Sequence, residues 1–296
     1  MDVIALGGGL GNQMFQYAFY LTKRKNAKVY LNFYFLKKNA EHNGCELDRA
    51  FGIQLQENSL INAIVMVVRK LLLFSHIKII RLVIKCLNII GIRVIHEPKN
   101  GLFQSHNHER IRGLNIYLGA WYSEKYFINQ REDIKKQFCF DILKINQQSK
   151  NMLDIIKEVN SVSIHVRRGD YMIGDNYKTH GDVCTVEYYK KAIGIIVNQV
   201  KFPVFIVFSD DVEWARKNIS LSFPAYYVNW NNGFDSWQDM FLMSSCNHNI
   251  IANSTFSWWA AWLNAYEDKI VIHPVSMRKD IETPDAFPKT WMRVCS

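Results

Sequence analysis

Residues 162–171 read Val-Ser-Ile-His-Val-Arg-Arg-Gly-Asp-Tyr, an apolar run that changes abruptly into a charged turn. The run Val162–Val166 is typical of a buried strand in a parallel sheet. In such sheets ligands bind beyond the carboxyl ends of the strands, which is where Arg167, Arg168 and Asp170 stand. Two adjacent guanidinium groups favour a diphosphate, because the planar fork of arginine matches phosphate oxygens. The alternative interpretation is a surface loop closed by an Arg–Asp ion pair.

Outward from this stretch, short apolar runs alternate with longer helical patterns, which predicts parallel sheets in an α/β fold. Expected strands are Val3–Leu6, Val29–Phe33, Ile116–Ala120, Val162–Val166, Val204–Phe208, Ile250–Ala252 and Ile270–Ile272. Expected helices are Asn12–Lys25, Ser123–Phe138, Gln147–Asn160, Val186–Gln199, Val212–Asn218, Ser236–Cys246 and Ser257–Ala265. At about 150 residues per domain, the 296 residues predict two domains. The boundary is expected between residues 150 and 151, within a polar helical run that precedes a fresh strand.

The composition is that of an ordinary globular protein, with 49% hydrophobic and 21% charged residues, and it excludes a disordered chain. The net charge of +9 favours an anionic partner such as nucleic acid, an anionic membrane or a phosphorylated substrate. The six cysteines are scattered without a CxxC pair, so we expect a reducing compartment and no structural zinc. The N-terminal residues lack signal-peptide features, and no apolar run reaches the roughly 18 residues of a membrane span.

A glycine-rich loop, residues 7–14 (GGGLGNQM), joins the first expected strand to an apolar helix. It matches neither the dinucleotide pattern G-x-G-x-x-G nor the P-loop, because the required third glycine and the GK[ST] element are missing. Two interpretations remain open. The loop either brings backbone N–H groups to an anionic ligand at the helix start, or simply makes a tight strand–helix turn.

Two further polar turns follow expected strands. In residues 208–214 (FSDDVEW), Ser209 or Asp210 either caps the next helix or offers hydrogen bonds to a base or ribose. Residues 247–259 (NHNIIANSTFSWW) place a polar turn at the start of an aromatic helix, which is either an anion cradle or a helix cap beside packed tryptophans. The polar residues of that turn are Asn253, Ser254, Thr255 and Ser257.

Taken in order, the motifs GGGLGNQMFQYA, HVRRGDY, FSDDVEW and CNHNIIANSTFSWWAAWLN resemble those of the bacterial α-1,2-fucosyltransferases of glycosyltransferase family 11. The resemblance implies the GT-B arrangement, in which two Rossmann-like domains with parallel sheets face one another. Residues 1–150 would form the acceptor-side domain with a basic helical insertion at about 58–96, and residues 151–296 the GDP-fucose-binding domain. The implied reaction is inverting transfer of L-fucose from GDP-β-L-fucose to the 2-hydroxyl of a terminal galactose, without a metal or other cofactor.

The resemblance also implies roles for individual residues. Arg167 is expected to stabilise the leaving diphosphate as a catalytic residue. Asp170 is a candidate for the base that takes the proton of the acceptor hydroxyl, with orientation of the arginines as its alternative role. Asp175, His180 and Asp182 remain alternative candidates for the base. The residues expected to bind the donor are Asn12, Gln13, His165, Arg168, Ser209, Asp210, Asn253, Ser254, Thr255 and Ser257.

The region between Asn58 and His96 contains no acidic residue but six lysines and arginines. Lys78, Arg81, Lys85 and Asn88 would form one polar stripe on an otherwise apolar helix. One interpretation is a helical hairpin packed on its own domain. The other, over residues 60–92, is a basic amphipathic surface that contacts anionic lipid at the cytoplasmic membrane face, near lipid-linked glycans of O-antigen biosynthesis.

The expected partners are GDP-fucose and a galactose-terminated or lipid-linked glycan. Nucleic acid is not expected, because the motif arginines stand at a strand end rather than in a basic stripe with exposed aromatic residues. Another fucosyl linkage and a non-catalytic module that binds a nucleotide sugar remain the alternatives.

Overall fold

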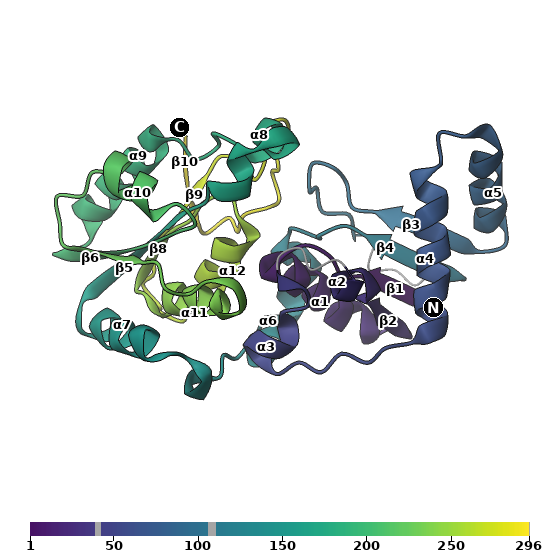
Figure 1. The fold of residues 1–296 in the computed structure, drawn as a ribbon, viewed down its shortest axis with the longest axis horizontal. Helices are drawn as coiled ribbons and strands as arrows, with labels where there is room; N and C mark the ends of the chain where they lie inside the picture. Colours follow the sequence, from purple (N-terminus) through teal and green to yellow (C-terminus); the bar gives the residue numbers. More distant parts are fainter. Residues whose placement is uncertain (39–42, 106–110, 296) are drawn as a thin grey trace. The chain divides into compact units, whose positions relative to one another are not determined.

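The computed structural model describes residues 1–38, 43–105 and 111–295, and the chain forms two compact units, residues 1–137 and 138–296 (Figure 1). Each unit is built on one sheet of parallel strands with helices packed against it. The expected fold class, α/β with two Rossmann-like units, is therefore confirmed.

The units divide at Gln137/Phe138, earlier than the boundary expected between residues 150 and 151. Phe138 packs edge-on against Trp259 with ring centroids 5.1 Å apart, and Phe140 stacks on Trp237 at 6.0 Å. These aromatic contacts tie the segment before the polar helix to the second unit, and the helical pattern of the sequence does not reveal them.

The first unit has the strand order β2-β1-β4-β3, and Figure 1 labels all four strands. Ile4 in the central strand lies opposite Leu31 on one side and Tyr117 on the other. At the amino end of the same strand, the buried carboxylate of Asp2 forms an ion pair of 3.2 Å with Lys23. The elements are β1 Asp2–Ala5, α1 Leu10–Arg24, β2 Val29–Asn32, α2 Tyr34–Lys38, α3 Leu47–Phe51, α4 Ser59–Leu73, α5 Lys78–Ile89, β3 Ile92–His96, β4 Leu114–Leu118 and α6 Arg131–Gln137, with 3-10 turns η3 Glu124–Tyr126 and η4 Ile128–Gln130.

Residues 58–96 form two helices, as the sequence suggests, and also strand β3, which the sequence does not predict. Helix α4 buries Ile61, Val65 and Val68 against Val3 and Ile116 of the sheet. Strand β3 then pairs with β4 along its whole length. Helix α4 therefore covers the sheet and β3 extends it. Of the three elements in this segment, α5 is the one peripheral to the core, and no residue of α5 is fully buried.

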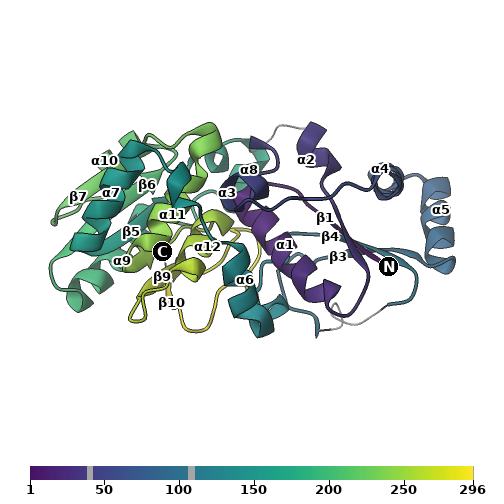
Figure 2. The same cartoon turned by 90° about the horizontal axis from the view of Figure 1, so that it is seen from below.

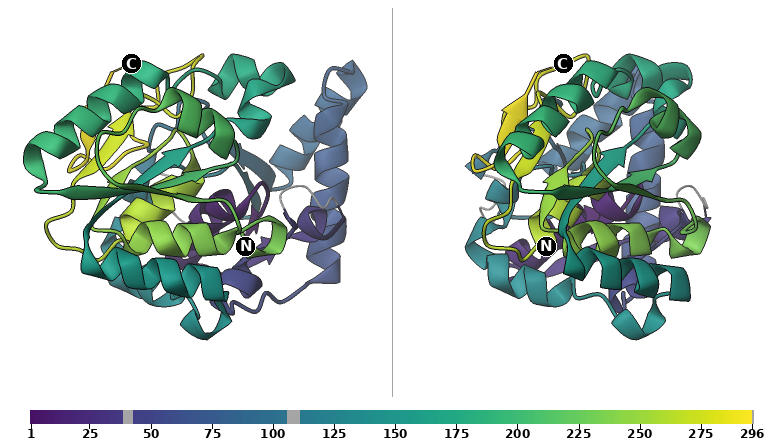
Figure 3. Two further views of the ribbon diagram at one scale, coloured as in Figure 1. Left: turned by 60° about the vertical axis from the view of Figure 1, so that its left-hand side comes forward. Right: turned by 90° about the vertical axis from the view of Figure 1, so that its left-hand side faces the viewer.

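The second unit has the strand order β10-β9-β8-β5-β6-β7. Figure 3 shows the ribbon of this unit, in teal, green and yellow, in two further orientations. Its core lies between the central strands and helix α9, whose Tyr188, Ala192 and Ile196 are fully buried. The helices are α7 Gln147–Glu158, α8 Gly174–His180, α9 Val186–Gln199, α10 Val212–Asn218, α11 Trp237–Ser245 and α12 Thr255–Leu263, with 3-10 turns η5 Ile142–Lys144, η6 Gly169–Met172 and η7 Gly233–Asp235. The strands are β5 Asn160–Val166, β6 Pro203–Ser209, β7 Ala225–Val228, β8 His248–Ile250, β9 Val271–Pro274 and β10 Met292–Val294.

The pairing register of the second sheet determines which turns lie next to one another at its carboxyl edge. His165 of β5 lies opposite Phe208 of β6, and Ile164 lies opposite Ile250 of β8. The turns after β5, β6 and β8 therefore leave the sheet side by side at one edge.

All seven expected strands are present, with ends shifted by a few residues, whereas β3, β7 and β10 were not expected. The expected helix Ser123–Phe138 is instead two 3-10 turns followed by the short α6. Among the described residues, no helix has the length and apolar character needed to cross a membrane.

Candidate active site

Three polar turns of the second unit converge at the carboxyl edge of its sheet. They follow β5, β6 and β8, which are neighbouring strands. Tyr171 after β5 donates a hydrogen bond of 3.3 Å from its hydroxyl to the carbonyl of Asn253 after β8. Arg168 after β5 donates its backbone N–H to Asp210 Oδ1 after β6, at 2.8 Å. The turns that the sequence singled out thus form one connected cluster.

Arg167 lies between two carboxylates in this cluster. Its Nη2 is 2.6 Å from Asp170 Oδ1, and its Nη1 is 2.9 Å from Asp210 Oδ2. The guanidinium carbon also lies 5.5 Å from the centre of the Tyr171 ring. About 29% of the Arg167 side chain remains exposed, so the guanidinium is fixed in orientation and still open to a ligand.

Arg168 is held by the aromatic ring of Trp214, which is not among the residues expected to bind the donor. Its guanidinium carbon lies 3.9 Å from the centre of the Trp214 ring, and its Nε is 3.6 Å from Asp211 Oδ2. Such stacking fixes the plane of the guanidinium and leaves its edge available for hydrogen bonds. The signal in the sequence was an aromatic residue in the first turn of the helix that follows a neighbouring strand end.

Gly169 is required by the closeness of the β6 turn. A Cβ atom at this position would lie 2.6 Å from Asp210 Oδ2, which is the same oxygen that pairs with Arg167. Any larger residue here would push the carboxylate away from the arginine.

His165 lies beneath the cluster, with 7% of its surface exposed and its ring 6.0 Å from that of Phe256. Burial, and then the charge of Arg167, lower the pKa of His165 to about 3. The imidazole is therefore neutral near pH 7. Tyr189 fixes the local backbone by donating its hydroxyl to the carbonyl of His165 at 3.0 Å.

The helix cap after β6 is Asp211, not Ser209 or Asp210. Asp211 Oδ1 accepts the backbone N–H of Trp214 at 3.1 Å, and Ser209 Oγ accepts that of Asp211 at 2.9 Å. Ser209 therefore shapes the turn. Asp210 is left to hold both arginines, through the side chain of Arg167 and the backbone of Arg168.

Three residues expected to bind the donor after β8 use their side chains within the protein. Asn253 donates from Nδ2 to the carbonyls of His180 and Met277, at 3.0 and 3.3 Å. Ser254 Oγ caps α12 by accepting from Phe256 N, and Ser257 Oγ donates to the carbonyl of Ser254. These side chains build the turn at the start of α12, and their expected role as donor ligands stays a prediction. Thr255, the first residue of α12, is partly exposed at that turn.

The three alternative base candidates differ in their surroundings. Asp175 is 94% exposed and pairs with Lys178 at 2.8 Å. Asp182 accepts a hydrogen bond from the Tyr177 hydroxyl and lies 3.7 Å from Lys279 Nζ.

His180 is the candidate that packs on the cluster itself. Its ring lies 4.9 Å from that of Tyr171. Burial and then the charge of Arg278 lower the pKa of His180, whereas the charges of Asp280 and Asp170 act in the opposite direction.

Gln13 in the first unit has a structural role. Its side chain is fully buried, with Nε2 donating to the carbonyls of Gly8 and Gly44 at 2.9 and 2.8 Å. Its Oε1 accepts the backbone N–H of Glu46 at 2.9 Å. Both polar atoms of this side chain thus have partners within the protein, so the structure supports a role in shaping the loop, and donor binding by Gln13 stays a prediction.

The start of α1 already carries a carboxylate of the protein. Glu46 Oε2 accepts the N–H of Leu10 at 3.1 Å, and burial raises the pKa of Glu46 to about 7. Asn12 is half-buried, and its side chain folds back over Gly8. A Cβ atom at Gly8 would lie 2.4 Å from Asn12 Nδ2, and the φ of Gly8, +74°, also favours glycine. The loop is therefore a tight turn closed by Glu46, and sequence spacing alone does not reveal this residue.

Comparisons with known proteins identify the family of this chain. The model of the family described as "Glycosyl transferase family 11" matches residues 2–294. The chain belongs to glycosyl transferase family 11.

Three relatives of this family 11 chain are named as glycosyltransferases. An Escherichia coli alpha-1,2-colitosyltransferase is 33% identical, with 99% of this chain and 98% of that protein covered. The E. coli O-antigen biosynthesis glycosyltransferase WbnK is 36% identical, with 91% and 92% covered. The galactoside alpha-(1,2)-fucosyltransferase 1 of Plecturocebus brunneus is 30% identical over 47% of this chain and 40% of that protein.

Within the described residues, this family 11 glycosyltransferase has no group of three or more His, Cys, Asp or Glu side chains placed to hold a metal ion. The charged groups at the sheet edge are instead paired with one another, two carboxylates on Arg167 and one beside Arg168.

Proposed function

We propose that this family 11 glycosyltransferase transfers L-fucose from GDP-β-L-fucose to the 2-hydroxyl of a terminal galactose, with inversion. The observation that carries the proposal is the position of Arg167, which lies at the carboxyl edge of the sheet between Asp170 and Asp210. A guanidinium held from two sides keeps its fork in one plane, as a diphosphate requires.

The reaction places specific demands on these groups. The galactose 2-hydroxyl oxygen attacks C1 of fucose, the bond from C1 to the β-phosphate oxygen breaks, and GDP leaves with the bonding electron pair. Negative charge grows on that phosphate oxygen in the transition state, so donors that are already oriented stabilise it most. Arg167 supplies the fork and Arg168, stacked on Trp214, supplies a second cation. Two such cations provide this neutralisation without a metal ion.

The proton of the acceptor hydroxyl needs a base. The ion pair of 2.6 Å favours the orienting role for Asp170, because its carboxylate is already engaged with the guanidinium of Arg167. This reverses the preference drawn from the sequence, and it leaves Asp175, His180 and Asp182 as candidates. Of these, His180 packs against Tyr171 beside the cluster and has a lowered pKa, which keeps it neutral and able to accept a proton.

The names of the relatives support an α-1,2 linkage and an O-antigen or galactoside acceptor. They also favour a second candidate donor, GDP-colitose, because the colitosyltransferase matches almost the whole chain. Colitose lacks the 3-hydroxyl of fucose. A site that hydrogen-bonds this hydroxyl would reject GDP-colitose strongly, whereas a site with apolar contacts there would accept both sugars.

A donor panel tests the proposal. The purified protein is given GDP-fucose, GDP-colitose, GDP-mannose and UDP-galactose separately, each with a β-galactoside acceptor, and released nucleotide and glycan product are both measured. The proposal predicts product from GDP-fucose at a higher kcat/KM than from the other donors. Preference for GDP-colitose would assign the second candidate, and nucleotide binding without product from any donor would indicate a non-catalytic module.

A further inference from the structure

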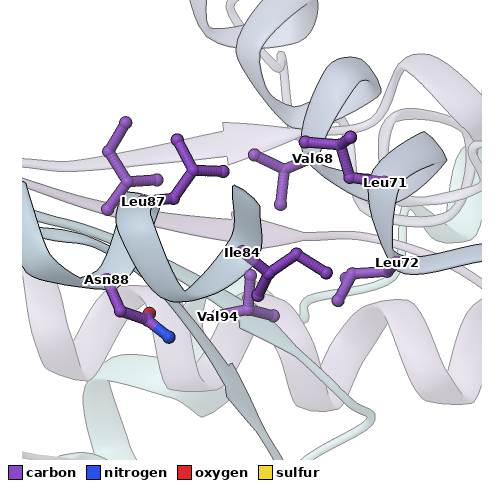
Figure 4. A pocket seen from close by; sticks show the side chains of 8 residues that line it. Val68, Leu71, Leu72, Ile84, Leu87, Asn88 and Val94 are labelled. Carbon is purple, nitrogen blue, oxygen red and sulfur yellow. The ribbon is translucent and has the colours of Figure 1, made fainter. Parts of the chain in front are cut away.

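The outer face of α5 in the first unit has features that the transfer reaction does not use. The helix contacts the rest of the unit through one side only, where Ile84 and Leu87 line a shallow apolar pocket with Leu72 of α4 and Val94 of β3 (Figure 4). Figures 1 and 2 show α5 at the margin of this unit. Its other side is open to solvent.

That open side is apolar rather than polar along much of its width. Ile79, Leu82 and Ile89 are 70%, 60% and 83% exposed, and Val83 and Cys86 lie on the same side of the helix. Ten of the 23 large apolar side chains that the described residues leave exposed lie between positions 60 and 90. Soluble proteins rarely concentrate apolar surface in this way without a partner.

A row of cations borders this apolar strip. Lys78, Arg81 and Lys85 recur at helical spacing and are exposed, and none of them makes an ion pair within the described residues. The absence of Asp and Glu from residues 58–96 means that no local carboxylate offsets their charge. The outer face of α5, residues 78–90, thus combines a strip of aliphatic side chains with a strip of cations.

We propose that the outer face of α5 binds the surface of an anionic lipid bilayer, with the aliphatic strip inserted at the headgroup boundary and the cations on lipid phosphates. The combination of positive charge and aliphatic surface distinguishes between three possible binding partners: a second copy of this chain, a nucleic acid and a lipid bilayer. A second copy of this face would oppose cations with cations, which disfavours self-association. Nucleic acid would meet aliphatic side chains where its bases need aromatic or hydrogen-bonding partners. An anionic bilayer can bury the aliphatic strip and pair its phosphates with the cations, as it does for interfacial amphipathic helices.

Vesicle flotation of the full chain tests this inference independently of the transfer reaction. The vesicles contain phosphatidylethanolamine with phosphatidylglycerol, or phosphatidylcholine alone. We expect the protein to float with the anionic vesicles, weakly at high salt, and not with the neutral ones. Each lysine contributes about a fivefold change in partitioning, so Lys78→Gln/Lys85→Gln is expected to lose about 25-fold. Ile79→Ser/Leu82→Ser/Ile89→Ser should abolish flotation.

Matched variants on the second unit provide the control. Lys157→Gln/Lys201→Gln removes two exposed lysines, and Leu143→Ser/Phe202→Ser removes two apolar side chains that are 88% and 84% exposed. Both should float like the parent, and thermal melting shows whether each variant is folded. Absence of flotation with the parent, equal flotation with neutral vesicles, or equal losses in the control variants would overturn the inference. So would lipid-free light scattering that shows a dimer broken by the Ile79→Ser/Leu82→Ser/Ile89→Ser variant.

Discussion

At the scale of single residues, the geometry around Arg167 explains why two acidic residues accompany two arginines at one edge of the sheet, after β5 and β6. Asp170 and Asp210 hold opposite ends of the same guanidinium. A charge buried or half-buried without such partners would be costly, and a paired one is oriented before the ligand arrives. Under the proposed function, we expect Arg167 to exchange part of this pairing for phosphate when a donor binds.

Arg167→Lys keeps the charge and removes the fork. If the transition state depends on a bidentate contact, kcat with GDP-fucose should fall on the order of a hundredfold or more. Arg216→Lys is the matched control, because Arg216 also stacks on an aromatic ring, that of Tyr227 at 3.9 Å, in the last turn of α10. Near-normal turnover by Arg167→Lys would refute the assigned role.

Asp170→Asn tests whether this carboxylate orients Arg167 or acts as the base. We expect transfer to be nearly lost and GDP binding, measured by calorimetry, to weaken as well, because the ion pair of 2.6 Å disappears. Asp175→Asn, a change in an exposed carboxylate of the following helix, should leave GDP binding intact. Unchanged GDP affinity in Asp170→Asn together with a lost kcat would return Asp170 to the role of base.

At the scale of elements, helix α1 shows how a loop that resembles an anion site is completed internally. The N–H of Leu10 at its start donates a hydrogen bond to the Glu46 carboxylate. The buried amide of Gln13 positions Glu46 by accepting its backbone N–H. The pKa of Glu46, raised from 4.5 to about 7 by burial, has a consequence for stability. Between these two pH values the folded protein binds more protons than the unfolded chain, so the free energy of unfolding falls as pH rises.

Glu46→Gln removes this titration and keeps an oxygen that can accept from Leu10. The free energy of unfolding of the variant, relative to the parent, should rise by about 2 kcal/mol between pH 5 and pH 8. Urea unfolding at both pH values measures the difference. Glu132→Gln, which alters a carboxylate that is 73% exposed, should leave the pH dependence as it is. Parallel curves for parent and Glu46→Gln would contradict this account of α1.

The same elements show what the sequence could and could not predict. The sequence predicts the strands that consist of apolar β-branched runs. It also indicates the turns after β5 and β6, because charge follows an apolar run there. Strand β3 was missed because it follows a basic helical region and contains Arg93, and the short edge strand β10 because two of its three residues are exposed. Side-chain partners across the chain, such as Glu46 with Leu10 or Arg168 with Trp214, depend on the fold and have no local pattern.

At the scale of the whole molecule, the account predicts an enzyme that needs no divalent metal. Under the proposed function, Arg167 and Arg168 would neutralise the diphosphate, which is the task that a metal performs in other transferases. Transfer should survive EDTA with little change in kcat. Loss of activity in EDTA, with recovery on adding Mn²⁺, would contradict the prediction and would direct attention to Asp211 and Glu213, which follow β6.

The central claim is that this chain is a catalyst that forms an α-1,2-fucosyl bond, and nuclear magnetic resonance of the product tests it most directly. The protein is incubated with GDP-β-L-fucose and a β-galactoside, and the glycan is isolated. The account predicts an α-linked fucose on the 2-oxygen of galactose, formed with inversion at C1. A β-linked fucose, attachment at another hydroxyl, or free fucose without any glycan product would contradict it.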